Sequence, residues 1–258
     1  MEVVQLWPNS PLGNFNYIVH DKKDAFVIDP FDAEFIKREL NKRNLNLKVI
    51  INTHDHWDHT KGNEKLAIET GCEVLCHHAS KMSIPAATRG VKAGEILGLG
   101  TKAELEVIET PGHTESHICL LLRKNDQNIA VFSGDTLFNA GVGNCKNGGC
   151  PKKLYNTISQ TFYKLDDDVL IYPGHDYIKN NLKFTLSIEP SNLFASTLFK
   201  DLEQSNLTYC SKITSIGEEK LINVFFRLGE ESIRQNLNLG TASDKEVFIK
   251  LRSLRDKW

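Results

Sequence analysis

The 258-residue sequence predicts an α+β fold, in which a mixed N-terminal region leads into a helical C-terminal region. Short β-rich runs alternate with amphipathic helical patterns as far as about His175. Many of the strand runs are continuously apolar, which indicates sheets covered by helices. After His175 the helical pattern replaces the β pattern. We therefore predict two domains, residues 1–177 and residues 178–258.

The N-terminal region opens in the order strand, strand, helix and then continues with a βαβ rhythm. Its first elements are expected as strands at 17–20, 25–29, 47–53 and 73–78 and as helices at 32–43 and 61–71. Gly71 is the expected C-cap of the second helix, because glycine readily takes the left-handed conformation there. The later elements are expected as strands at 105–110, 117–123, 129–135 and 169–175 and as a helix near 151–164.

The C-terminal region is expected to be helical, apart from a polar stretch near 203–220 with little regular pattern. Its last segment begins with Ser243 and Glu246, which are spaced as a capping box. The predicted buried stripe of this helix consists of Val247, Leu251, Leu254 and Trp258. This stripe places Arg252 and Arg255 together on one flank of the helix.

Composition excludes several classes of protein without naming a function. The formal net charge of −2 gives no basic excess that would attract nucleic acid or anionic lipid. No apolar run approaches the ~18 residues that span a bilayer, and no secretory signal is evident at the start. We expect a cytoplasmic monomer that binds neither nucleic acid nor membrane. The six cysteines contain no CxxC pair, so we expect reduced thiols, mostly in the core.

A histidine-rich run directly follows the predicted strand 47–53. In an extended chain His54 and His56 point the same way, so both imidazoles can bind one ion. Asp58 and His59 follow where the chain turns toward a helix, so their side chains diverge toward a second ion. The alternative is a solvated polar loop that is rich in histidine by chance. Four ligand-type residues within six positions favour the metal site.

Three further candidate ligands lie at the ends of predicted strands or in the loops after them. They are His113, Asp135 and His175, and each follows a glycine that suits a tight turn. Taken singly, each residue has an alternative role without a metal. His113 could cap a turn, Asp135 could cap a helix, and His175 could be a core histidine. Together with the first run they supply ligands for two ions if Asp135 bridges them. Nitrogen and carboxylate ligands suit zinc first, with iron or manganese as alternatives.

Other histidines are set aside by their position. His117 opens an apolar strand, where a supporting or packing role is expected. His77 and His78 are consecutive in a predicted strand and should therefore point to opposite faces.

These motifs resemble the metallo-β-lactamase superfamily, whose fold is an αββα sandwich with its site at the sheet edges. The segments SGDTLFNAGVGN, PGHDYIKNNLKF and LRSLRDKW are more specifically similar to glyoxalase II, the hydroxyacylglutathione hydrolases, and the resemblance covers essentially the whole chain. It implies that Asp135 bridges two ions. It assigns the first ion to His54, His56 and His113 and the second to Asp58, His59 and His175.

The resemblance also implies where glutathione binds. Arg252 and Arg255 match the C-terminal motif, and a guanidinium pairs well with a carboxylate. Tyr177 resembles the tyrosine that contacts glutathione in this family. The loop at 141–149 departs from the animal-type pattern, because Asn144 and Lys146 replace a lysine and a tyrosine. Lys146 can supply the same charge from a shifted position. The alternative for the two arginines is that they lie on a solvated face of the helix and bind no ligand.

The expected reaction is hydrolysis of S-(2-hydroxyacyl)glutathione thioesters, such as S-D-lactoylglutathione, to a hydroxy acid and glutathione. A metal-bridging hydroxide is the expected nucleophile, because the chain has no GxSxG elbow and no evident Cys–His pair. We expect Asp58, His54 and His59 to take part in the chemistry. The alternatives are a persulfide dioxygenase-like mononuclear iron oxidoreductase, another thioesterase of this fold, or a non-catalytic binding protein.

Overall fold

The computed structural model describes residues 2–99, 103–205, 209 and 212–258. The chain forms two compact units that interleave along the sequence. Unit 1 comprises Met1–Thr110, Ser116–Gly134 and Tyr172–His175, and unit 2 comprises Pro111–Glu115, Asp135–Ile171 and Asp176–Trp258. The predicted second domain therefore lies wholly in unit 2, together with residues 111–115, 135–171 and 176–177, which the sequence assigned to the first domain.

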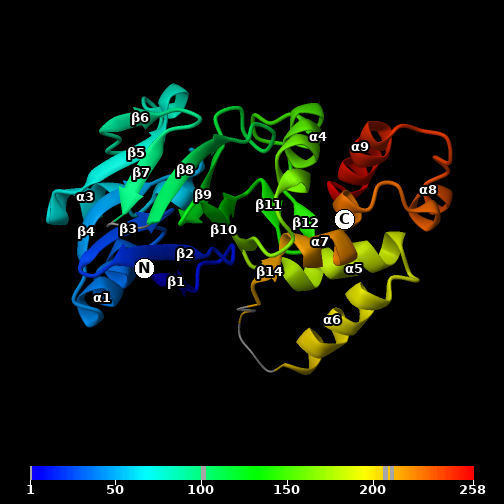
Figure 1. Ribbon diagram of the computed structural model, residues 1–258, viewed down its shortest axis with the longest axis horizontal. Helices are drawn as coiled ribbons and strands as arrows, with labels where there is room; N and C mark the ends of the chain where they lie inside the picture. The colour runs from blue at the N-terminus through cyan, green and yellow to red at the C-terminus, as the bar shows by residue number, and fades with distance from the viewer. Residues whose placement is uncertain (1, 100–102, 206–208, 210–211) are drawn as a thin grey trace. The chain divides into compact units, whose positions relative to one another are not determined.

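The first sheet of unit 1 has the order β1-β2-β3-β4-β5-β6 (Figure 1). Its strands are β1 (Glu2–Leu6), β2 (Asn16–Asp21), β3 (Asp24–Ile28), β4 (Asn46–Ile51), β5 (Glu73–His77) and β6 (Arg89–Val91). The first three strands pair antiparallel, whereas β3 to β6 pair parallel. The carboxyl ends of β3, β4 and β5 therefore lie at one edge of this sheet.

Two helices, α1 (Ala33–Lys42) and α3 (Asn63–Thr70), cover one face of this sheet (Figure 1). Ile36 and Leu40 of α1 and Leu66 of α3 form a buried core with Val27 and Ile50 of the strands. The alternate positions of the strands point to the other face, which explains why these strands are apolar throughout. The predicted cap at Gly71 is confirmed by its φ of 69°.

The second sheet of unit 1 consists of β7 (Ile96–Leu99), β8 (Ala103–Glu109), β9 (Ile118–Lys124), β10 (Gln127–Gly134) and the end of β13 (Leu170–Pro173). The strands of this sheet that lie in unit 1 have the order β13-β10-β9-β8-β7, and β7 to β10 pair antiparallel. Tyr17 of β2 links the two sheets, because its hydroxyl donates to the Pro173 carbonyl and its ring packs on Phe132.

Unit 2 combines short strands with most of the remaining helices. Its elements are β11 (Leu137–Phe138), β12 (Gly141–Val142), α4 (Pro151–Gln160), η2 (Phe162–Lys164), α5 (Ile178–Ile188), α6 (Leu193–Gln204), β14 (Thr214–Ser215), α7 (Ile216–Ile222), η3 (Val224–Phe226), α8 (Glu231–Asn236) and α9 (Asp244–Arg255). Ile178, Leu182, Ala195 and Ile222 form one core cluster with Ala140. Phe225 of η3 packs against Phe184 and Phe248, which joins α5 to α9.

Two expectations about the C-terminal region are wrong. The stretch near 203–220 contains regular structure, since β14 and α7 occupy 214–222 and Ser215 and Glu218 form a capping box. Trp258 is 56% exposed and does not join the buried stripe of α9, because the helix ends at Arg255. Phe248 fills the core instead. The capping box of Ser243 and Glu246 is confirmed.

Half-buried and buried thiols both occur among the described cysteines. Cys72, Cys76 and Cys119 are buried, Cys145 and Cys150 are half-buried, and all five are free thiols. Cys210 lies outside the described residues. Within the described part of the chain, no helix has the length and apolar character needed to cross a membrane.

Candidate active site

The histidine-rich run of unit 1 lies just beyond the carboxyl end of β4. The short helix α2 (Trp57–Thr60) begins within it and turns Asp58 and His59 away from the direction of the strand. His54, Asp58 and His59 are all buried, so these polar groups need partners or a cation. The predicted divergence of the side chains thus has a structural cause, the start of α2.

Three ligand-type groups of unit 1 converge beside α2. The Nε2 atoms of His59 and His175 are 3.1 Å apart, and Asp58 Oδ2 lies 3.5 Å and 3.4 Å from them. His59 Nδ1 faces the Asp29 carboxylate at 2.8 Å, and His175 Nδ1 faces the Leu12 carbonyl at 3.0 Å. Both partners can only accept a hydrogen bond, so each Nδ1 carries the proton in the neutral ring.

The outer hydrogen bonds therefore leave a lone pair on both Nε2 atoms, next to a carboxylate oxygen. These three groups repel one another unless a cation lies among them. Two imidazole nitrogens and a carboxylate oxygen are suitable ligands for zinc, iron or manganese. The residues Asp58, His59 and His175 therefore fit one divalent ion.

His54 is oriented in the same manner by Thr53. The Thr53 hydroxyl donates to Asp29 Oδ2 at 2.6 Å, so it accepts the proton of His54 Nδ1 at 3.0 Å. The Nε2 lone pair of His54 then points at His56 Nδ1, 3.0 Å away. The structure thus brings His54 and His56 together with their ring nitrogens converging, as expected from the period of the extended chain.

His113 and Asp135 belong to unit 2 and lie close to each other there. His113 Nε2 is 3.5 Å from Asp135 Oδ2. His113 Nδ1 donates to the Asn144 carbonyl at 2.7 Å, which again leaves Nε2 with the lone pair. A Cβ on Gly143 would lie 1.9 Å from the Asp135 carbonyl oxygen, so this loop can approach Asp135 only with glycine at that position.

All five residues expected to bind substrate line one cavity of unit 2. The cavity has a volume of about 200 Å³ and is lined by Asn144, Lys146, Tyr177, Arg252 and Arg255 together with Phe138, Val142, Asn181, Asp256 and Trp258. Residues from the 142–146 loop, the start of α5 and the end of α9 therefore meet, although more than 100 positions separate the loop from α9 in the sequence.

The two arginines differ in how their donors are used. Arg252 is 3% exposed, and its Nη1 donates to the Val142 and Gly143 carbonyls at 2.8 Å and 3.0 Å. Its Nε and Nη2 bind the Asp256 carboxylate. Arg255 donates to Asn181 Oδ1 at 3.2 Å and lies over the Phe184 ring. Burial lowers the pKa of both guanidinium groups. Arg252 therefore mainly holds the loop, and Arg255 is better suited to a ligand.

The other cavity residues are partly tied to their neighbours. Lys146 Nζ donates to the Asp256 carbonyl at 2.8 Å, and its backbone N–H donates to Asn144 Oδ1 at 3.0 Å. Tyr177 packs edge-on against Phe138. Since the Asn144 carbonyl also accepts from His113, one loop residue contacts both a candidate metal ligand and the cavity.

Comparison with known proteins identifies the family. Residues 10–175 match the model of the metallo-beta-lactamase superfamily, and residues 176–258 match the model of the hydroxyacylglutathione hydrolase C-terminus. Hydroxyacylglutathione hydrolases from Polaromonas sp. and Nitrosococcus oceani are 41% and 40% identical over the full length of both chains. The chain belongs to the hydroxyacylglutathione hydrolase family.

Solved structures agree with this assignment at the level of the fold. ETHE1 from Myxococcus xanthus is 25% identical with a TM-score of 0.68, covering 98% of this chain and 91% of its own. The BLEG-1 B3 metallo-beta-lactamase is 21% identical with a TM-score of 0.67, covering 87% and 99%. The expected metallo-β-lactamase α+β fold with a helical C-terminal region is confirmed, as is the resemblance to glyoxalase II.

The sequence patterns did not reveal three residues of unit 1 that form hydrogen bonds supporting the candidate ligands, namely Asp29, Thr53 and Asn14. Asp29 accepts from both Thr53 and His59, and Asn14 donates to Asp58 Oδ2 at 2.8 Å. A signal for Asp29 was available, because it follows β3, which runs parallel to β4 and ends at the same edge. Asn14 gave no such signal, since its role depends on contacts with residues 44 positions away.

The histidines that were set aside also have defined positions. His117 Nδ1 lies 2.9 Å from the Thr110 hydroxyl, and its ring stacks on His54 at 5.0 Å, as expected for a supporting residue. His77 and His78 do not point to opposite faces of one strand, as was expected, because β5 ends at His77 and a 3₁₀ turn begins at His78. Their rings lie 4.3 Å apart, and His77 Nδ1 accepts the Ala79 N–H.

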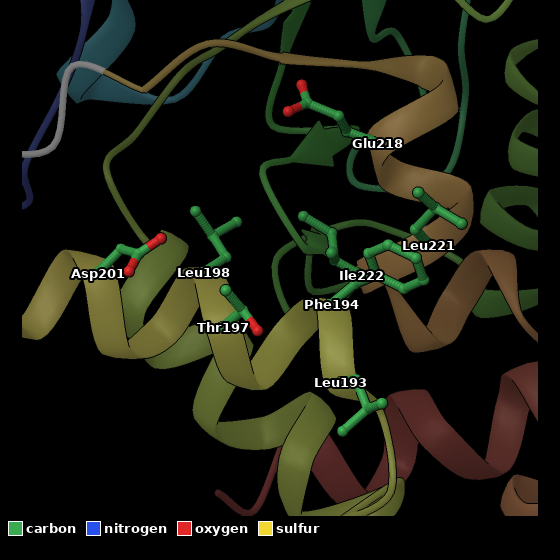
Figure 2. Close-up of a pocket in the computed structure, with 8 residues that line it drawn as sticks. All are labelled: Leu193, Phe194, Thr197, Leu198, Asp201, Glu218, Leu221 and Ile222. Atoms are coloured by element: carbon green, nitrogen blue, oxygen red, sulfur yellow. The ribbon is translucent and has the colours of Figure 1, made fainter.

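A larger cavity of about 520 Å³ lies between α6 and α7 of unit 2 (Figure 2). Apolar side chains of Leu193, Phe194, Leu198 and Leu221 face it, and carboxylates lie at its edge (Figure 2). It contains none of the expected site residues. Because its charged groups are acidic, it matches a carboxylate-bearing ligand less well than the smaller cavity does, despite its greater volume.

Proposed function

We propose that the chain hydrolyses S-(2-hydroxyacyl)glutathione thioesters, with S-D-lactoylglutathione as the characteristic substrate and D-lactate and glutathione as products. The observation that carries this proposal is the cavity lined by Lys146, Tyr177 and Arg255 in the part of the chain that matches the family's own C-terminal model. Glutathione carries two carboxylates, which a guanidinium and an ammonium group can bind.

We propose that two divalent ions, zinc first, with iron or manganese as alternatives, are held by seven side chains. The lone pairs of His54, His59, His113 and His175, set by their outer hydrogen bonds, support this assignment. The proposed ligands are His54, His56 and His113 for one ion, Asp58, His59 and His175 for the other, and Asp135 for both. Bound ions of this kind lower the pKa of water to ~7 and polarise a carbonyl oxygen.

The chain's own residues fix where protons reside during the reaction. Asp29 keeps the His59 proton on Nδ1, and Thr53 does the same for His54. Asp58 is buried beside His59, and we propose that its carboxylate accepts a proton from the attacking water. The leaving thiol has a pKa of ~8.5 and departs as thiolate, so a separate general acid is not needed.

In the substrate site, we assign the direct contacts to Arg255, Lys146 and Tyr177. Arg252 and Asn144 support the loop that presents Lys146. Arg252 donates to the Val142 and Gly143 carbonyls, and the Asn144 carbonyl accepts from His113. Three properties stay predictions from the sequence: a cytoplasmic location, a monomeric state, and the lack of binding to nucleic acid or membrane.

The decisive experiment follows thiol release from S-D-lactoylglutathione with a thiol-reactive chromogen. We expect rapid release by the purified protein, loss of release after chelation and recovery on adding Zn²⁺. Chelation-insensitive release, or no release at all, would refute the proposal. Oxygen uptake with glutathione persulfide in place of thioester hydrolysis would instead support the mononuclear iron alternative.

A further inference from the structure

The loop from Ser10 to Asn14 contacts two of the three groups that converge beside α2. The Leu12 carbonyl accepts from His175 Nδ1 at 3.0 Å. The Asn14 side-chain amide donates to Asp58 Oδ2 at 2.8 Å. Asn14 also forms a β-bridge with His175, and the neighbouring Phe15 N–H donates to the Gly174 carbonyl at 2.8 Å. This loop is therefore attached to the strand end that carries His175.

Ser10 fixes the orientation of the Asn14 amide. Its hydroxyl accepts the Asn14 backbone N–H at 2.8 Å and donates its single proton to Asn14 Oδ1 at 2.6 Å. The amide oxygen is thereby committed to Ser10, and the NH₂ group must face Asp58. The Asp58 carboxylate can only accept, which demands the same orientation. Gly13, with a φ of 71°, allows the tight turn that closes this ring of bonds.

The bond from Asn14 constrains the oxygen of Asp58 that lies nearest the two imidazoles. Asp58 Oδ2 is 3.4 Å and 3.5 Å from the Nε2 atoms of His175 and His59. One lone pair of Oδ2 accepts from Asn14, and the other stays directed toward the imidazoles. Both Asn14 and Ser10 are buried, at 1% and 7% exposure, so water cannot readily replace the pair.

We infer that Ser10 and Asn14 are positioning residues that set the metal affinity of the Asp58, His59 and His175 site without touching the ion. This inference rests on the metal content of the proposed function. Hydrogen bonds that orient metal ligands usually contribute a factor of about 10–100 in affinity. The effect should be selective, because neither residue contacts His54 or His56 among the described hydrogen bonds.

The test is a titration of the chelated full-length protein with Zn²⁺ in competition with a chromogenic chelator. Wild-type protein should bind two ions. Asn14→Leu, which keeps the size but removes the donor, should weaken one binding step by about 10–100-fold and leave the other unchanged. The weakened step should be the one that His175→Ala abolishes. Asn156→Leu, on the exposed face of α4, should change neither step.

Ser10→Ala provides a second variant with a smaller perturbation. It should weaken the same step by a smaller factor, and the double variant should be no weaker than Asn14→Leu alone, because Ser10 acts through Asn14. Unchanged affinity in both variants, equal weakening of both steps, or a single ion in wild-type protein would overturn the inference. The titration uses no thioester, so a protein that shows the selective loss but lacks hydrolase activity would refute only the proposed function.

Discussion

At the scale of single residues, the site is organised by the partners of its histidines. Each of His54, His59, His113 and His175 has Nδ1 next to an oxygen that accepts its proton, so each Nε2 keeps its lone pair for the proposed role as a ligand atom. This arrangement makes the tautomer of each ring a property of the folded protein before any ion binds. The supporting oxygens come from Asp29, Thr53 and two backbone carbonyls.

Replacing Asp29 with asparagine should reverse the tautomer of His59. The asparagine NH₂ group can donate to Nδ1, which moves the ring proton to Nε2, where the ion is expected. We predict that Asp29→Asn weakens Zn²⁺ binding by about 10–100-fold, measured by chelator competition. Asp21→Asn, at the end of β2, is the matched control and should leave binding unchanged. Tight Zn²⁺ binding by Asp29→Asn would contradict the assigned role.

The two C-terminal arginines should give different phenotypes. Arg255→Ala should raise KM for S-D-lactoylglutathione by about 10–100-fold with kcat within about twofold, because it removes the proposed contact with a carboxylate of the glutathione part and not with the reacting thioester. Arg252→Ala should instead lower the unfolding free energy by roughly 2–4 kcal/mol, because it leaves the Val142 and Gly143 carbonyls without their donor. Steady-state kinetics and urea unfolding measure the two effects.

Arg38→Ala, on the exposed face of α1, serves as the control for both measurements. A pure KM effect in Arg252→Ala with unchanged stability would show that this arginine contacts substrate directly, as the sequence motif alone suggested. The motif could not separate the two residues, because the difference arises from the loop that packs on Arg252 and not from its helix.

At the scale of elements, sequence patterns predicted most of unit 1 and much less of unit 2. The βαβ elements follow hydrophobic periodicity, and two predicted strands of this unit end next to the candidate ligands His54 and His175. Strands of two residues, such as β14, have too few positions to show any periodicity. The helix α7 was also missed, because its apolar pattern is interrupted. α7 buries Glu219, a charged residue that interrupts its apolar pattern.

Glu219 makes α7 sensitive to pH. It is fully buried and accepts bonds from Ala140, Thr214 and Asn223, yet burial raises its pKa from 4.5 to about 7. The folded state therefore binds a proton more tightly than the unfolded state does. Stability from this group is fully present below about pH 4.5 and is lost as the pH rises through about 7.

We predict that wild-type protein loses up to about 3 kcal/mol of unfolding free energy between pH 5 and pH 8 relative to Glu219→Gln. Urea unfolding followed by tryptophan fluorescence at several pH values measures this difference. Glu203→Gln, on the exposed face of α6, should keep the wild-type pH dependence. Parallel curves for wild type and Glu219→Gln would mean that the three donors keep Glu219 ionised throughout.

At the scale of the whole molecule, the family models and the compact units divide the chain differently. The superfamily model ends at residue 175 and the C-terminal model begins at 176, whereas unit 2 also takes in segments 111–115 and 135–171. The predicted domain boundary after residue 177 lies near the division between the family models, because the β pattern of the sequence ends there. The interleaving was not predictable, since it depends on contacts between distant segments.

The bonds from Arg252 to residues 142 and 143, and from Glu219 to Ala140, have a consequence for how such a protein can change in evolution. The C-terminal region supplies partners to backbone groups encoded much earlier in the gene. A recombination that replaced only the residues after 175 would leave those carbonyls and N–H groups unmatched. The two regions must therefore be inherited together or be adapted to each other by changes on both sides of the junction.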